Sequence, residues 1–200
     1  MAAYPAELER TIVLRDGARL GLRPIRPEDE ERLMRFHDKL SGNTQYQRFF
    51  AVVRRLPPDW ARALSNVDYQ RRLALVAEHG DGPSPELVGV ARYEPTGEPG
   101  TAEIAFVIQD SWQNRGLGTL MLDALLAAAD ARGVRRFRAY VLATNGRMID
   151  LLTRFTDIGE RRTQSGVTEL TFTRKPADRA PARERRERPG DQAGMSASSR

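Results

Sequence analysis

The chain of 200 residues contains no cysteine and only two histidines, His37 and His79. Without cysteine it cannot build a disulfide framework, use a thiolate nucleophile or hold a metal ion through sulfur, so a cysteinyl acyl-enzyme is excluded. Two isolated histidines do not form a metal cluster either. We therefore expect a protein that works without a metal ion.

Long apolar runs are also lacking. No window approaches the roughly 20 apolar residues that a membrane-spanning helix needs. Residues 1–10 carry acidic side chains and have no apolar stretch of the kind found in signal peptides. We expect a soluble, cytoplasmic protein with no membrane partner.

Positive charge is in excess, but it is unevenly placed. The formal net charge is +5, and residues 175–200 hold seven basic and four acidic residues, which leaves +2 for residues 1–174. This last segment is rich in Pro, Ala, Ser and Arg, and cannot bury enough apolar surface to fold. We interpret residues 175–200 as a disordered basic tail. It could touch RNA weakly, but we do not expect a nucleic-acid partner.

Apolar periodicity and turn residues divide the rest into one domain, residues 11–174, after a flexible segment of residues 1–10. Two strands flank the Asp16-Gly17 turn, two helices follow, and three antiparallel strands lead to a glycine-rich loop. The predicted strands are 11–14, 19–23, 72–77, 86–93, 101–108, 137–142, 158–161 and 167–174, and the predicted helices are 27–40, 57–64, 117–131 and one from 144 or 145. The aromatic and basic residues 46–50 fit no element, and core packing or substrate contact would explain them.

The glycine-rich loop, Gln113-Asn114-Arg115-Gly116-Leu117-Gly118-Thr119, joins a strand to a helix. Unpaired amides and the helix dipole favour an anion at such a helix start, and glycines let it approach the backbone, so the natural ligand is a phosphate. Gly118 is not followed by the Lys-Ser/Thr of a nucleotide-hydrolysing P-loop. The third glycine and the ribose-binding acid of a dinucleotide site are missing too.

The pattern Gln-x-x-Gly-x-Gly resembles the pyrophosphate loop of the GCN5-related N-acetyltransferase (GNAT) family. The order of predicted elements is similar over about residues 10–174, and the resemblance is closest to bacterial protein lysine acetyltransferases through segments 22–29, 46–50, 102–108, 112–119 and 145–148. It implies a single α/β (α+β) domain with a mixed, mostly antiparallel sheet, a central parallel βαβ unit and helices on both faces. It also implies that two strands splay apart to form a coenzyme A cleft.

In that family the cleft holds acetyl-CoA as co-substrate. The resemblance implies that Val107 and Ile108 contact pantetheine through main-chain atoms. It implies that Asn145 hydrogen-bonds the pantetheine arm, unless this residue is only a helix N-cap. The pyrophosphate would be wrapped by Gln113, Asn114, Arg115, Gly116, Leu117, Gly118 and Thr119. Arg115 would add positive charge there, or would be an ordinary solvated arginine.

Transfer to an amine needs a base, because a lysine amine with a pKa of about 10.4 is almost entirely protonated at neutral pH. Glu103 is the only acid in the apolar strand 101–108, and alternation puts it on one face with Ala105 and Val107. A charge on a central strand is costly unless it is paired or functional. Related lysine acetyltransferases have their general base at the corresponding glutamate. The alternative is a carboxylate ion-paired with an arginine.

Leu152 stands where many family members have a tyrosine that protonates the leaving thiolate, so we assign no general acid. We expect an acetyl-CoA-dependent N-acetyltransferase that acts by direct transfer, with a protein lysine as the acceptor that the resemblance implies. A small amine or a protein N-terminus as acceptor, a catalytically silent acyl-CoA-binding module and a basic-tailed nucleic-acid binder are the alternatives. The sequence does not indicate an oligomeric state.

Overall fold

The computed structural model describes residues 3–82 and 84–176. Its strands are β1 (Arg10–Val13), β2 (Arg19–Pro24), β3 (Leu73–His79), β4 (Glu86–Pro95), β5 (Thr101–Ile108), β6 (Arg136–Leu142), β7 (Thr156–Gln164) and β8 (Val167–Arg174). These strands form one sheet in the order β1-β2-β3-β4-β5-β6-β8-β7. Neighbouring strands are antiparallel, except that β5 and β6 are parallel.

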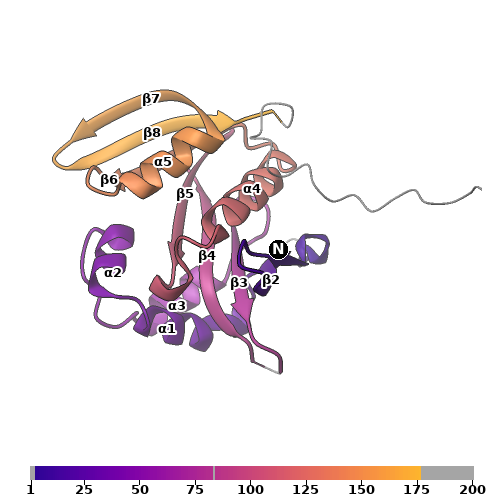
Figure 1. The fold of residues 1–200 in the computed structure, drawn as a ribbon. Helices are drawn as coiled ribbons and strands as arrows, with labels where there is room; N and C mark the ends of the chain where they lie inside the picture. Colours follow the sequence, from indigo (N-terminus) through magenta and orange to yellow (C-terminus); the bar gives the residue numbers. More distant parts are fainter. Residues whose placement is uncertain (1–2, 83, 177–200) are drawn as a thin grey trace, which may run out of the picture.

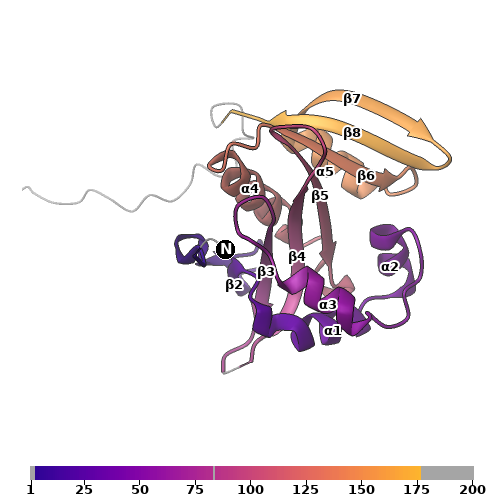
Figure 2. The same cartoon turned by 180° about the vertical axis from the view of Figure 1, so that it is seen from behind.

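Helices cover both faces of the sheet. In the described part of the chain they are α1 (Glu30–Asp38), α2 (Gly42–Phe49), α3 (Pro58–Ser65), α4 (Leu117–Asp130) and α5 (Gly146–Phe155), with short 3-10 turns η1 (Ala6–Leu8), η2 (Pro27–Asp29) and η3 (Asp110–Trp112). Figure 1 shows α4 and α5 in front of the sheet, and Figure 2 shows α1 and α3 in front of the opposite face. α2 packs against β5 and β6.

None of the described helices combines the length and apolar character that crossing a bilayer requires. The predicted cytoplasmic location stays a prediction.

The core lies between the sheet and these helices. Consecutive side chains of β3 and β4 are buried on both faces, because helices cover both. α4 packs closely on β4 at Gly89, where a Cβ would meet the sulfur of Met121 at 2.9 Å. The absence of a side chain at Gly89 therefore lets α4 lie directly on β4, and this contact helps to place the start of α4 beside the end of β5.

β5 and β6 are paired only where the two strands begin. The parallel register runs from Thr101 opposite Arg136 to Glu103 opposite Arg138 and stops there, although β5 continues to Ile108. On their outer sides, β5 keeps its pairing with β4 and β6 keeps its pairing with β8. The two strands therefore separate after Glu103, and backbone groups on their facing edges have no partner in the sheet.

This architecture confirms the predicted fold class, with a mostly antiparallel sheet, one parallel βαβ unit, splayed strands and helices on both faces. The strands lie close to their predicted positions. α2 is the element that was not predicted, because its polar sequence, Gly-Asn-Thr-Gln-Tyr-Gln-Arg-Phe, has little helical propensity and no apolar period. It is stabilised instead by an N-cap, since Ser41 Oγ accepts a hydrogen bond from the Thr44 amide at 3.2 Å.

Most of the predicted basic tail, residues 177–200, lies outside the described residues, as do residues 1, 2 and 83. The flexibility predicted for residues 1–10 and the domain boundaries stay predictions. Tyr4 and Glu9 of that first segment contact the domain. The ring of Tyr4 lies edge-on to Tyr69 with centroids 5.6 Å apart, and its hydroxyl donates to Glu9 at 2.6 Å.

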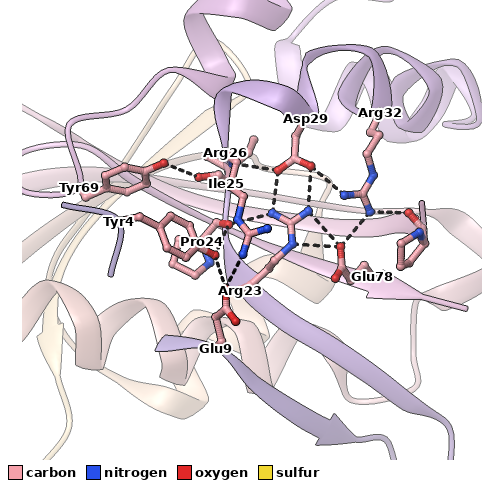
Figure 3. Close-up of polar contacts among 11 residues, drawn as sticks. Tyr4, Glu9, Arg23, Pro24, Ile25, Arg26, Asp29, Arg32, Tyr69 and Glu78 are labelled. Atoms are coloured by element: carbon pink, nitrogen blue, oxygen red, sulfur yellow. Dashed lines mark hydrogen bonds and ion pairs between the residues drawn. The ribbon is translucent and has the colours of Figure 1, made fainter. Parts of the chain in front are cut away.

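A group of charged residues is buried where β2 meets α1 (Figure 3). Arg23 donates two hydrogen bonds to Asp29, of 2.7 and 2.8 Å, and one to Glu78 of 3.1 Å. Arg32 bridges the same two carboxylates at 2.8 Å each. We call Arg23, Asp29, Arg32 and Glu78 the buried ion-pair network. Every charge in it has a partner of opposite sign, and it lies in β2, η2, α1 and β3, away from the splayed strands.

Candidate active site

A cavity of about 450 Å³ opens where β5 and β6 separate. This volume lies in the range of roughly 300 to 1,000 Å³ that is usual for small-molecule sites. Its walls come from β5, β6, α2, α5 and the start of α4. The predicted site residues that line it are Glu103, Val107, Ile108, Gln113, Asn114, Gly116, Gly118, Thr119 and Asn145. We call this cavity the cleft.

The pairing of β5 with β4 determines which main-chain groups face the cleft. The Gln109 amide donates to the Val88 carbonyl at 3.0 Å, and the Thr96 amide donates to the Thr101 carbonyl at 3.3 Å. Alternation along an antiparallel ladder then directs the amides and carbonyls of odd-numbered β5 residues toward β4. Those of even-numbered residues point toward β6.

Ile104, Phe106 and Ile108 are the even-numbered residues beyond the last β5–β6 pair. The backbone groups of Phe106 and the amide of Ile108 line the cleft as an unpaired strand edge does, and they can pair with an extended ligand. The Ile108 carbonyl already accepts a hydrogen bond from Gln113 Nε2 at 3.0 Å. The amide and carbonyl of Val107 point instead toward Val90 of β4. Val107 therefore lines the cleft through its side chain. Main-chain pairing in the cleft is therefore available at both backbone groups of Phe106 and at the amide of Ile108. The resemblance implies main-chain contacts at Val107 and Ile108.

The start of α4 lies at the C-terminal end of β5. Gly116 is the N-cap, with a φ of 93°, in the left-handed region that glycine adopts without strain, and no side chain caps the helix. The Leu120 amide donates to the Gly116 carbonyl at 3.3 Å. The amides of Leu117, Gly118 and Thr119 precede this bond and have no carbonyl partner within the helix. Such amides, with the positive end of the helix dipole, make a site suited to phosphate.

Two side chains of the loop before α4 hold it to α2. Gln113 Nε2 donates to the Ile108 carbonyl at 3.0 Å and to Thr44 Oγ1 at 3.2 Å. Asp110 accepts hydrogen bonds from the Ser41 amide, the Ser41 hydroxyl and the Thr44 hydroxyl at 2.7 to 3.0 Å. The Gln113 side chain thus fixes the end of β5 and one wall of the cleft.

Arg115 and Leu117 are the two predicted site residues whose side chains do not line the cleft. Leu117 is buried in the core. Arg115 forms an ion pair with Asp16 at 2.5 Å, and its guanidinium lies 4.2 Å from the centre of the Trp112 ring. Arg115 therefore lies at the partly exposed surface of the loop, and its charge is paired with Asp16.

Asn145 is the N-cap of α5 and also lines the cleft. Its Oδ1 accepts a hydrogen bond from the Met148 amide at 3.2 Å. Among residues 3–82 and 84–176, its Nδ2 has no hydrogen-bond partner. The capping role and a contact with a ligand use different atoms of the same side chain, so the two interpretations are compatible.

Glu103 is exposed at the point where β5 and β6 separate, and it lines the cleft. Its neighbour across the β4–β5 ladder is another carboxylate, Glu94. Glu94 is ion-paired with Arg72 at 2.6 Å and with Arg92. The neighbour on β6, Arg138, is directed instead to Glu98 and Glu169.

Among the residues that the structure describes, Glu103 has no ion-pair partner. The ion-paired alternative for this residue therefore does not hold in the described part of the chain. Of the two adjacent carboxylates, Glu94 is paired with two arginines, and Glu103 lines the cleft without an ion-pair partner in the described residues.

Arg48 of α2 belongs to the site, although the sequence left residues 46–50 undecided. It is half-buried and lines the cleft together with Gln47 and Phe50. Burial and the nearby charge of Arg92 lower the pKa of Arg48 to about 10, with Glu103 acting in the opposite direction. Arg48 therefore remains protonated at neutral pH and places a positive charge in the cleft, near enough to Glu103 for the two charges to interact.

Leu152, at the position where many relatives have a tyrosine, has a fully buried side chain. Tyr140 of β6 is 40% exposed and lines the cleft. Tyr140 therefore contributes to the cavity from a different element than Leu152.

In the described ranges, 3–82 and 84–176, no three His, Asp or Glu side chains are grouped to hold a metal ion. The expectation that the protein works without a metal stays a prediction.

Comparison with known proteins identifies the family. The family model of the acetyltransferase (GNAT) domain matches residues 19–155. The chain belongs to the GNAT family of acetyltransferases. An acetyltransferase of Pseudomonas aeruginosa is 35% identical over 149 residues, which cover 74% of this chain and 80% of the relative. The acetyltransferase Pat of Mycolicibacterium smegmatis is 33% identical over 172 residues, which cover 85% of this chain. The chain spans 50% of the length of that protein.

Among solved structures, the GNAT domain of S. lividans PAT has a TM-score of 0.77 at 34% identity, covering 86% of this chain and 99% of that domain. A cAMP-binding acyltransferase from Mycobacterium smegmatis has a TM-score of 0.59 at 28% identity, covering 88% of this chain and 51% of that one. This GNAT domain therefore shares its fold with domains that also occur within longer chains.

Proposed function

We propose that this GNAT domain transfers the acetyl group of acetyl-CoA to a primary amine, and that the acceptor is the side chain of a protein lysine. One observation carries the proposal, namely that β5 and β6 separate after Glu103. The separation opens a single cleft that contains both the unpaired amides at the start of α4 and an unpaired carboxylate. The amides can bind the diphosphate of an acyl carrier, and the carboxylate can accept a proton from a protonated amine.

The residues present fit acetyl-CoA as co-substrate. The amides of Leu117, Gly118 and Thr119 suit its diphosphate. The extended pantetheine arm would take the place of a missing strand beside β5, pairing with backbone groups of Phe106 and Ile108. The free Nδ2 of Asn145 adds a donor on the opposite wall. Val107 contributes its side chain in this proposal.

Glu103 serves as the general base. It accepts a proton from the acceptor amine, whose nitrogen then attacks the thioester carbonyl carbon. A C–N bond forms, the C–S bond breaks, coenzyme A leaves as a thiolate, and the amide nitrogen loses its second proton to water. No residue is assigned to protonate this thiolate. A thiol in water has a pKa of about 8.5, so the thiolate is a tolerable leaving group.

Three observations support a protein lysine as the acceptor. The sequence motifs resemble those of bacterial protein lysine acetyltransferases, and the fold is similar to the GNAT domain of S. lividans PAT along almost the whole length of that domain. Phe50 and Tyr140 are exposed aromatic residues that line the cleft, and Tyr46 is an exposed aromatic residue of α2. They offer contact area to a polypeptide. Small amines and protein N-termini are the rival acceptors.

The proposal is tested by incubating the protein with isotope-labelled acetyl-CoA and a cell extract, then mapping label by peptide mass spectrometry. We expect acetyl groups on lysine side chains, together with release of free coenzyme A. Label found only on N-termini or small amines would replace the proposed acceptor. Acetyl-CoA binding without coenzyme A release, for any amine offered, would instead identify a silent acyl-CoA-binding module.

A further inference from the structure

The hairpin between β1 and β2 lies against the glycine-rich loop, although the two segments are about 100 residues apart in the chain. Its turn residue Asp16 pairs with Arg115 at 2.5 Å. The Arg15 amide also donates to the Arg115 carbonyl at 3.4 Å. The hairpin is therefore fixed to the loop by one ion pair and one main-chain hydrogen bond.

This contact places Arg15 directly over the N-cap of α4. A Cβ built on Gly116 would lie 3.4 Å from Nε of Arg15 and 3.5 and 3.7 Å from its Cγ and Cδ. The side chain of Arg15 is exposed and lines the cleft. In the described part of the chain, its guanidinium has neither an ion pair nor a hydrogen bond.

A free guanidinium at this position conflicts with helix electrostatics. The N-terminus of a helix carries a partial positive charge, so a cation there is unfavourable and an anion is favourable. Arg115 does not share the conflict, because Asp16 neutralises it. A bound phosphate would resolve the conflict for Arg15 by meeting both the α4 amides and the guanidinium.

We propose that Arg15 is a ligand of the diphosphate of acetyl-CoA, and that Arg115 is a positioning residue that holds the hairpin, and with it Arg15, at the start of α4. The inference rests on the proposed function, because it concerns the same cleft. It reverses the assignment that the sequence suggests. The cation that meets the phosphates comes from the first hairpin of the chain, and the arginine within the motif acts through Asp16.

The test measures Kd for acetyl-CoA and for 3′-dephospho-acetyl-CoA by calorimetry with the wild-type protein and the Arg15→Gln variant. Loss of one charge-assisted contact should raise both Kd values roughly tenfold. Raising the salt concentration should weaken the wild type more than the variant. Arg15→Lys, which keeps the charge but not the fork of donors, should fall between them. Arg19→Gln, at an exposed arginine of the same hairpin outside the cleft, is the control and should bind as the wild type does.

An unchanged Kd in Arg15→Gln would overturn the proposal. So would a loss confined to the ligand with a 3′-phosphate, because the contact would then be with that group. If the wild type bound neither ligand, the proposed function itself would fail, which is a distinguishable result. Thermal unfolding of each variant checks that an exposed substitution has not altered the fold.

The positioning role of Arg115 is tested by a double-mutant cycle. Arg115→Gln alone should weaken acetyl-CoA binding severalfold, because the hairpin loses its ion pair. In the Arg15→Gln background the same change should have little further effect, since the group that it positions is already absent. Additive losses would show that Arg115 acts independently of Arg15 and would overturn this part of the inference.

Discussion

Arginine and carboxylate side chains gather in two regions of this molecule, the buried ion-pair network of Figure 3 and the cleft between β5 and β6. In the network, Arg23 and Asp29 are less than a tenth exposed and every charge has a partner. In the cleft, Glu103 and Arg15 are exposed and have no ion-pair partner among the described residues. The same residue types thus serve to hold the fold in one region and are left available for a ligand in the other.

Structural and functional charges in this molecule differ in whether they have an ion-pair partner. A buried charge must be paired, because removing it from water without a partner costs several kcal/mol. A charge in an open cleft keeps its solvation and can remain unpaired until a ligand arrives. Whether a charge is paired therefore says more about its role than its residue type does. Substitutions in the network should lower the melting temperature, whereas substitutions in the cleft should change acetyl-CoA binding or turnover.

Replacement of the unpaired carboxylate should give the largest effect. Glu103→Gln removes the proton acceptor without changing the shape of the side chain, so turnover should fall by roughly 10² to 10⁴. The Kd for acetyl-CoA and the melting temperature should stay at wild-type values. Glu160→Gln, an exposed glutamate of β7 away from the cleft, is the matched control. Normal turnover in Glu103→Gln would remove this residue from the mechanism.

A substitution in the buried ion-pair network should have the opposite result, a loss of stability without a loss of binding. Asp29→Asn leaves Arg23 and Arg32 without one of their carboxylates, and breaking such a buried pair should cost about 3 to 5 kcal/mol of stability. The melting temperature should fall by roughly 10 °C. At a temperature where the variant is folded, acetyl-CoA affinity should be retained. Glu31→Gln, which removes one partner of the exposed Glu31–Arg35 pair, should change stability very little. A stable but non-binding Asp29→Asn protein would contradict the distinction between the two regions.

In our proposal, the side chain of Asn145 has one atom that caps α5 and another that binds the ligand. Asn145→Asp keeps the oxygen that caps α5 and loses the amide donor, so we expect an unchanged melting temperature and a Kd for acetyl-CoA raised roughly tenfold. Asn145→Ala should lose about 1 kcal/mol of stability in addition. Equal acetyl-CoA affinity in Asn145→Asp and the wild type would leave capping as the role of this residue.

The smallest expected effect is a difference between wild type and Asp29→Asn in how stability depends on pH. Burial alone would raise the pKa of Asp29, but hydrogen bonds from Arg23 and the Arg26 amide outweigh it and lower the pKa. A carboxyl whose pKa is lowered on folding contributes stability above its unfolded pKa of about 3.9, and this contribution is lost as the pH falls through the folded value. Urea unfolding of wild type and Asp29→Asn should therefore differ most at neutral pH and converge below about pH 4. A constant difference down to pH 3 would contradict the account.

Much of this fold could be predicted from the sequence, because its signals are local. Alternation and turn residues indicated the strands, glycines marked the start of α4, and an asparagine before an apolar helix indicated the cap at residue 145. Glu103 was conspicuous as a single acid in an apolar strand, and the structure places it at the separation of β5 and β6. Each of these features is encoded within about ten neighbouring residues.

The features that could not be predicted depend on distant contacts. α2 has few helix-forming residues and is held by Asp110 and Gln113, which lie over 60 residues later. For Arg115 the sequence left open a charge near the phosphates or a solvated arginine, and its ion pair with Asp16 could not be predicted because the two residues are 99 positions apart. Whether Val107 or Phe106 directs its main-chain groups into the cleft depends on the β4–β5 register. Alternation within one strand does not reveal that register.

The central claim is that main-chain amides of β5 and α4 hold the diphosphate and pantetheine of acetyl-CoA. A titration with acetyl-CoA, followed by amide-resolved NMR, tests it most directly. The account predicts that the largest shifts fall on the amides of Phe106, Ile108, Gly118 and Thr119, with little change around Arg23 and Asp29. Shifts that are absent, or that cluster away from the cleft, would contradict it.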